Sequence, residues 1–151
     1  MVASDDDAIE NALAAVTASQ WTHLQTLVEA VDPRQPGVWE GGEEVERSSD
    51  GQPVLSMPYF DYSEALSNLN RALYEYQIIV PIDWMAWSAE HPTALHSLAI
   101  VDVSTNDIVK YLVSAVRGDR FSEGHLASEV HSGVFLPALL VLIQRQLELN
   151  S

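Results

Sequence analysis

The chain contains no cysteine and only seven lysine and arginine residues, and Lys110 is its single lysine. Without cysteine there is no disulfide, no thiolate zinc site and no cysteine nucleophile, so several classes of enzyme are excluded. The seven basic residues face 22 acidic ones, which gives a formal net charge of −15. Because a surface with this charge repels other polyanions, general nucleic-acid binding is disfavoured.

The sequence also lacks the patterns of membrane segments and of common cofactor sites. No apolar run approaches the roughly 20 residues that cross a bilayer. The start, Met1 to Asp7, is acidic where a secretory signal would be basic and then apolar. No Gly-x-Ser-x-Gly turn, phosphate loop or dinucleotide fingerprint is present. We therefore expect a cytoplasmic protein that enters no membrane and holds no cofactor.

What is present indicates one folded domain over residues 1–151, with residues 1–5 disordered. The apolar fraction is 47%, and four tryptophans contribute to it. A chain of about this length buries roughly 68–70% of its extended surface, so it needs no disulfide or metal to fold. A hydrophobic core is expected.

The apolar residues recur with helical spacing, which predicts an all-α bundle of about five to seven helices. In the first stretch, Ile9, Ala12, Leu13 and Val16 fall at i, i+3, i+4 and i+7. Residues 5–31 therefore form one helix or two, with a break most expected at 17–20. The other expected helices cover about 63–76, 84–87, 95–101, 105–117, 121–131 and 134–149, and the last of these is apolar enough to lie centrally.

Side chains that can accept a hydrogen bond from a free N–H group mark several helix starts. Ser4, Ser63, Asp83 and Ser104 each precede such a pattern. The short apolar run 78–82 fits a buried extended connection. Trp84 and Trp87, three residues apart, share one helix face, and we interpret them as core residues rather than as a stacking platform for a ligand.

Residues 33–58 form the stretch least compatible with a buried helix. They hold four of the seven prolines and four of the seven glycines. A long loop is expected, in which Val38-Trp39 and Val54-Leu55 pair as a small hairpin across residues 48–51. A loop of this length in a compact domain is either functional or mobile, and Trp39 indicates that part of it packs against the body.

The densest cluster of unlike polar groups lies at 117–125, between two expected helices. Gly118 suits the left-handed position that closes a helix, and Asp119 or Ser122 can cap the next one. Arg117 and Arg120 beside a helix start could hold a phosphate or carboxylate. Alternatively, Asp119 and Glu123 neutralise the two arginines, and the corner is a structural latch.

The candidate ligand-binding residues are those of the corner together with three upstream positions: Arg117, Asp119, Arg120, Glu123, His125, Tyr62, Asp83 and Trp84. Paired carboxylates can serve acid–base hydrolysis only if they converge in one pocket, which spacing cannot decide. His125 and Glu129 lie at i, i+4, but the stretch does not follow the His-Glu-x-x-His zinc pattern. No metal site is expected.

Three motifs resemble those of an uncharacterised bacterial family that is catalogued as a domain of unknown function. They are Pro58-Tyr59-x-x-Tyr62-Ser63, Pro81-x-Asp83-Trp84-x-x-Trp87 and Arg117-x-Asp119-Arg120-Phe121-x-Glu123-Gly124-His125-Leu126. The similarity spans about 58–149, and Ile82 stands where the family has phenylalanine. The resemblance implies the extent of the domain but no activity, cofactor or catalytic residue.

Three functions fit these observations. The first is a small acidic binding or regulatory protein without catalysis, forming a homodimer through an apolar helical face. The second is a ligand-binding or enzymatic domain in which Arg117 and Arg120 bind an anionic group and His125 or Glu123 moves a proton. The third is an acidic protein that docks on a basic partner or mimics nucleic acid, for which the acids should form one continuous face.

Overall fold

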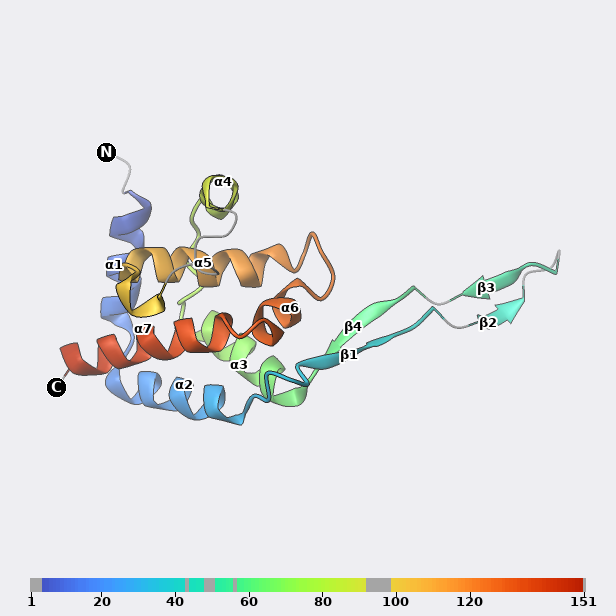
Figure 1. Ribbon diagram of the computed structural model, residues 1–151, viewed down its shortest axis with the longest axis horizontal. Coiled ribbons are helices and arrows are strands. Elements are labelled where there is room, and N and C mark those ends of the chain that lie inside the picture. Colours follow the sequence, from blue (N-terminus) through green and yellow to red (C-terminus); the bar gives the residue numbers. More distant parts are fainter. Residues whose placement is uncertain (1–3, 43, 48–50, 56, 92–98, 151) are drawn as a thin grey trace.

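The computed structural model describes residues 4–42, 44–47, 51–55, 57–91 and 99–150, and it is mostly helical, as the apolar spacing predicts (Figure 1). Within these residues lie seven α-helices and one 3-10 turn. The helices are α1 (Asp5–Ala15), α2 (Ala18–Ala30), α3 (Glu64–Glu75), α4 (Trp84–Glu90), α5 (Thr105–Gly118), α6 (His125–His131) and α7 (Phe135–Leu149), and the turn is η1 (Ile100–Asp102). The strands are β1 (Gly37–Glu40), β2 (Glu44–Arg47), β3 (Pro53–Leu55) and β4 (Tyr59–Tyr62).

The N-terminal stretch forms two helices, and the chain breaks at Val16 and Thr17. Thr17 and Gln20 make a reciprocal capping box, in which each side chain accepts from the other residue's backbone N–H. Ser4 caps α1 by accepting from Asp7 N at 3.1 Å. Residues 1–3 lie outside the described part, so the expected disorder of residues 1–5 stays a prediction.

The core surrounds α7, which packs against α2, α5, α6 and η1. Its Phe135, Leu139, Leu142 and Ile143 are fully buried, so the predicted central position of the last helix is confirmed. The helix lies there because its residues before Gln144 are apolar on nearly all sides.

Among the described residues, no single helix combines the length and apolar character needed to cross a membrane. In the same part of the chain, α6 and α7 taken together are long and apolar enough, but they are bent by 79° where they join.

Most of the predicted caps are confirmed. Ser63, Asp83 and Ser104 each accept from the backbone N–H three residues later, at 3.1–3.2 Å. The run Ile78–Val80 is buried as expected, and Trp84 and Trp87 pack against the core from α4. The helix expected at 95–101 falls mostly on residues 92–98, outside the described part, and the chain that follows forms η1.

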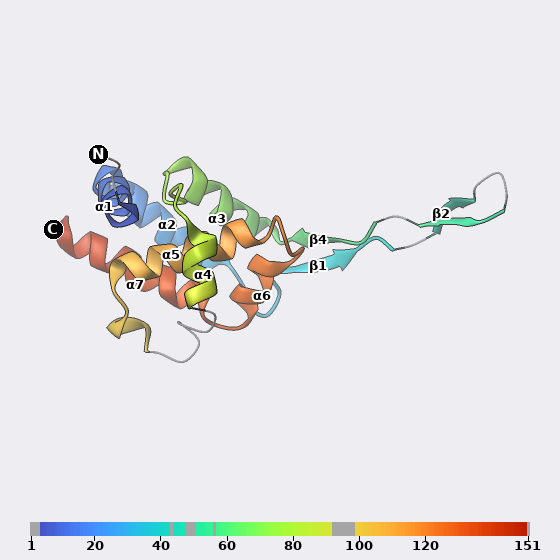
Figure 2. The same cartoon turned by 90° about the horizontal axis from the view of Figure 1, so that it is seen from above.

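The stretch expected as a loop is a β-ribbon, here called the arm (residues 37–62), that projects from the helical body (Figures 1 and 2). β1 pairs with β4 next to the body, and β2 pairs with β3 farther out. Gly41 and Gly42, both with positive φ, separate the two halves.

The predicted hairpin exists, but the predicted partners are wrong. Trp39 lies opposite Phe60, not opposite Val54 or Leu55, and Val54 lies opposite Glu46. The strand that pairs with Val38-Trp39 is the Tyr59–Tyr62 segment, which the sequence motif places before a helix. The ribbon is therefore longer than predicted, and it extends outward rather than across the surface.

Two polar contacts that were not predicted join elements of the body. Lys110 Nζ lies 2.9 Å from Asp6 Oδ1 and links α5 to α1. Arg145 of α7 donates to the carbonyl oxygens of Val101 and Val103 and to Thr105 Oγ1, at 2.9–3.1 Å. These bonds hold η1 and the start of α5 against the last helix.

Candidate functional site

The corner between α5 and α6 (residues 117–125) is a series of tight turns. Phe121 N and Ser122 N both donate to Gly118 O, and His125 N donates to Ser122 O at 3.0 Å. Gly124 is the N-cap of α6 and has φ +79°, which favours glycine. Around these turns, Asp119 and Glu123 contact the arm, whereas Arg117, Arg120 and Phe121 line a pocket.

Gly118 does not adopt the predicted left-handed conformation. It is the last residue of α5, and the left-handed glycine of the corner is Gly124. Gly118 is instead required by close contact, because a Cβ at this position would lie 2.9 Å from the His125 ring. The His125 ring thus packs against the end of α5.

Both acids of the corner contact the arm. Asp119 Oδ1 accepts from the Tyr62 hydroxyl and also from Leu126 N at 3.2 Å. Glu123 Oε1 accepts from Phe60 N at 2.8 Å. Asp119 therefore serves the start of α6, as predicted, while it also anchors β4.

Tyr62 stays protonated at its contact with Asp119. Burial raises the pKa of the Tyr62 phenol, and the hydrogen bond to Asp119 with its negative charge raises it further. A phenol held in this form keeps its proton near neutral pH and donates a hydrogen bond to the carboxylate. The Tyr62 and Asp119 pair is thus a structural contact.

Aromatic rings of the arm cover the corner where Gly124 has no side chain. Trp39 and Phe60 are in edge contact, with ring centroids 5.4 Å apart, and Phe60 lies 5.1 Å from Tyr62. A Cβ at Gly124 would meet Trp39 at 3.1 Å and Phe60 at 3.3 Å. Trp39 therefore packs against the body with one edge, as expected for part of this stretch.

The two arginines lie on the other side of the corner, at a pocket of about 320 Å³. The half-buried Arg117 has its guanidinium carbon 5.5 Å from the centre of the Tyr74 ring. In the described part of the chain, neither Arg117 nor Arg120 has a carboxylate within 4 Å. The ion pairs with Asp119 and Glu123 that the latch alternative requires are therefore not formed among the described residues.

The pocket lies between the corner, α4 and the connection that precedes α4. Trp84 and Phe121 face each other across it, with ring centroids 6.0 Å apart. Its lining consists of Val80, Pro81, Ile82, Trp84, Met85, Arg117, Arg120 and Phe121. Two cations thus stand at the edge of an otherwise apolar hollow.

Several of the candidate residues lie away from this pocket. Asp83 is exposed and caps α4, and its backbone N–H donates to Asp5 Oδ2 at 3.3 Å. Tyr62, Asp119, Glu123 and His125 are also absent from the lining. Of the eight candidates, the structure brings Arg117, Arg120 and Trp84 together here and places most of the others at the base of the arm.

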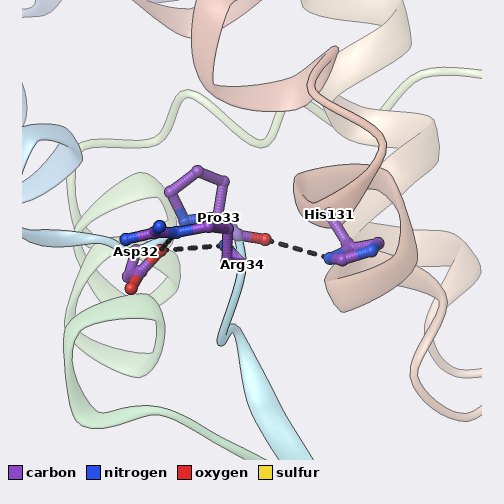
Figure 3. A network of polar contacts seen from close by, with 4 residues as sticks. All are labelled: Asp32, Pro33, Arg34 and His131. Atoms are coloured by element: carbon purple, nitrogen blue, oxygen red, sulfur yellow. Dashed lines mark hydrogen bonds and ion pairs between the residues drawn. The ribbon is translucent and has the colours of Figure 1, made fainter.

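The histidines of α6 are held by other contacts. His131 Nδ1 lies 3.3 Å from Pro33 O and so links α6 to the segment before β1, where Arg34 pairs with Asp32 (Figure 3). Glu129 accepts from the Tyr111 hydroxyl at 2.6 Å rather than approaching His125. Among the described residues, no three His, Asp or Glu side chains are placed to hold a metal ion.

Sequence reasoning did not identify the apolar wall of the pocket. Val80, Ile82 and Met85 belong to the run before and within α4, and Phe121 was assigned to the following helix although it is 72% exposed. The available signal was that exposed aromatic beside two arginines.

A larger hollow of about 580 Å³ lies at the other end of the body, between α1, α5 and α7. Its only charged lining residue is Glu10, and the rest of its polar lining consists of amide and hydroxyl groups such as Gln146 and Ser104. It contains none of the candidate residues. The pocket at the corner has the more specific chemistry.

Comparison with known proteins identifies a family and no function. The chain belongs to a family of unknown function, DUF6508, whose model matches residues 16–148. The match includes the whole of the region that the three motifs mark and extends to α2 and the arm. No curated protein matches the chain, and no solved structure does.

Proposed function

We propose that this member of the DUF6508 family is a non-catalytic binding protein whose corner pocket takes a small ligand with a carboxylate or phosphate group and an apolar part. The observation that carries the proposal is the pair of arginines at that pocket, neither of which has an acidic partner in the described residues. Arg71 and Arg145 also lack such a partner in the described residues, so what distinguishes Arg117 and Arg120 is that both border one hollow.

The charge of the site favours an anion. Arg117 and Arg120 are three residues apart at the end of α5 and both border the same hollow. A guanidinium donates two parallel hydrogen bonds to a carboxylate or phosphate, which makes arginine the usual residue for this recognition. With two arginines and no acid among its described lining residues, this pocket carries a local positive charge.

The walls of the site favour a ligand with a flat or aliphatic part. Trp84 and Phe121 offer ring faces, and Val80 and Ile82 supply the apolar side. The volume of about 320 Å³ is at the lower end of the range for small-molecule pockets, roughly 300–1,000 Å³. A ligand of one ring and one acidic group fits these limits.

The lining supports binding rather than catalysis. Among the described residues that border the pocket there is no carboxylate and no imidazole, so no side chain there is suited to move a proton at neutral pH. His125 packs on Gly118, and Glu123 is bound to Phe60 N. The residues that the enzymatic hypothesis needs are directed elsewhere.

Thermal unfolding tests this proposal. Benzoate, phenyl phosphate and inorganic phosphate are added to the wild type, to Arg120→Ala and to Arg71→Ala, with sodium chloride at matched ionic strength. Arg71 is an exposed arginine on α3, so its removal changes the net charge equally without touching the pocket. A ligand at 100 times its dissociation constant adds about 2.7 kcal/mol, or roughly 5–10 °C in a domain of this size.

We expect phenyl phosphate or benzoate to raise the melting temperature of the wild type and of Arg71→Ala, and to have no effect on Arg120→Ala. Equal shifts in all three proteins would contradict the proposal, and so would a rise that sodium chloride reproduces. Inorganic phosphate alone separates recognition of the anion from recognition of the ring.

A further inference from the structure

The arm carries exposed apolar side chains and a strong negative charge. Val38 and Trp39 are each 58% exposed, Tyr59 is 49% exposed and Met57 is 83% exposed. Residues 37–62 include six acids and one arginine. The ribbon thus combines apolar and acidic residues, and the helical body meets it only at its base.

One edge of the inner ribbon is already occupied. Ser63 N donates to Pro36 O, and Phe60 N donates outward to Glu123. Residues opposite each other in an antiparallel pair alternate between bonded and non-bonded. Since Pro36 and Ser63 are bonded, Trp39 and Phe60 form a non-bonded pair, and β4 directs its free groups toward the corner.

The other edge is free. By the same alternation, the N–H and C=O groups of Trp39 point away from β4, and they have no hydrogen-bond partner within the described residues. Unpaired groups of this kind form a template for an additional strand, and proteins usually protect them with proline or lysine. β1 contains neither residue.

A ribbon of two strands is marginally stable in water and gains stability from a third strand or a covering helix. Among the described residues, no strand other than β4 pairs with β1, and a hollow of about 280 Å³ separates Gly37 and Trp39 from Ala127 and His131 of α6. An added strand could therefore form hydrogen bonds with this edge, and its addition would stabilise the ribbon.

We propose that the outer edge of β1 is a docking site for an extended basic segment of another protein, bound by strand addition. Charge selects this partner. A second copy of the chain would bring its own negative charge, and a nucleic acid would bring phosphates, so both are repelled by the acidic arm. An arginine-containing strand is attracted.

The side chains beside the edge fit such a segment. A strand paired with β1 places alternate residues next to Trp39 on one face and next to Val38 and Glu40 on the other. An arginine over the exposed Trp39 ring makes a cation–π contact, and one near Glu40 or Asp61 makes an ion pair. Backbone bonds give the register, and these contacts select the basic residues.

The test uses an eight-residue peptide of Arg-Arg-Thr-Thr repeated, which presents arginine on both faces of a strand. It is fluorescently labelled, and anisotropy is measured at about 0.15 M sodium chloride. A second peptide has the same sequence with every backbone amide N-methylated, which removes the hydrogen-bond donors of both of its edges. The variant Glu40→Gln/Asp61→Asn removes two charges from the arm. Glu10→Gln/Glu75→Gln removes two exposed charges from the body and serves as the matched control.

We expect the unmodified peptide to bind the wild type, the body control and Arg120→Ala equally, and to bind the arm variant at least fivefold more weakly. N-methylation should weaken binding at least tenfold. Absence of binding to the wild type overturns the proposal. Equal weakening in the arm variant and the body control would show attraction by net charge alone, and equal affinity of the N-methylated peptide would exclude strand addition.

Discussion

The contact between Tyr62 and Asp119 shows that the acids of the corner hold the arm and α6, whereas its arginines line the pocket. The Tyr62 hydroxyl donates to the Asp119 carboxylate, which also accepts from Leu126 N. One carboxylate thus holds the last residue of the arm and the first turn of α6. The arginines next to Asp119 in sequence are left for the pocket, because the acids are already engaged.

Replacing Tyr62 by Phe should lower the free energy of unfolding at pH 7 by about 1–3 kcal/mol, as expected for a hydrogen bond to a charged group. The change is measured by urea denaturation. Tyr59→Phe is the control, since the Tyr59 hydroxyl bonds the Glu40 carboxylate at 2.7 Å on the exposed arm. Because exposed contacts contribute little, we expect a smaller loss there.

The same pair makes stability depend on alkaline pH. The folded pKa of Tyr62 is raised above its usual value of 10.0, so the stabilisation is fully present below about pH 10. Above that pH the unfolded chain loses the proton while the folded chain keeps it, and stability falls as pH rises. Tyr62→Phe should therefore show a shallower fall between about pH 9 and 11, and an unchanged slope would contradict this assignment.

At this scale, the sequence predicts local contacts and not distant ones. Ser63, Asp83 and Ser104 cap their helices because the acceptor and its N–H lie three residues apart. Asp119, by contrast, bonds Tyr62, which is 57 positions away, rather than the neighbouring Arg120. Spacing in sequence contains no information on that choice, so the latch and the anion site remained alternatives.

Among the elements, the arm and α6 are joined through Gly124. Gly124 and Gly133 have nearly the same positive φ, +79° and +86°. Only Gly124 faces aromatic rings, whereas a Cβ at Gly133 would meet nothing within 4 Å. Alanine substitutions at these two positions can therefore separate the free-energy cost of backbone strain from that of displacing the arm.

We expect Gly124→Ala to destabilise the protein more than Gly133→Ala does. Both variants carry the strain of a left-handed alanine, about 1–2 kcal/mol. Gly124→Ala additionally displaces Trp39 and Phe60, which should change the tryptophan fluorescence of the folded state. Equal unfolding free energies together with unchanged fluorescence in both variants would show that the rings do not depend on this contact.

The arm also shows which secondary-structure elements could not be predicted from the sequence. Proline and glycine content identified residues 33–58 as non-helical, and the described part of that stretch contains strands and no helix, while the turn expected at 48–51 falls mostly outside the described residues. The partner of Trp39 was missed because Tyr59-Phe60-Asp61-Tyr62 lies 20 residues downstream, beyond the range of turn chemistry. Its three aromatic residues are a strand signal that the neighbouring helix start obscured.

For the whole molecule, the net charge of −15 should weaken the folded state through repulsion. We expect the melting temperature to rise as sodium chloride is increased from about 0.01 to 1 M, over which the screening length falls from about 30 to 3 Å. Differential scanning calorimetry measures this, with sucrose as an uncharged control. A melting temperature that is constant or falls with salt would contradict the expectation.

The overall fold was predicted better than the site. Helical spacing and capping residues specify a mostly helical protein, and the apolar α7 is central, as expected. The pocket is formed by α4, the 80–82 segment and the corner, which meet only in the folded chain. Its arginines could be named as candidates from the sequence, but its walls could not.

The arm adds much to the length of the molecule and little to its mass (Figure 2). Friction in water depends on extent, so a single chain of this shape diffuses and sediments more slowly than a sphere of equal mass. On a gel-filtration column it elutes early, at a volume that a compact dimer would share. The number of chains in solution therefore has to come from light scattering or sedimentation equilibrium, which report mass independently of shape.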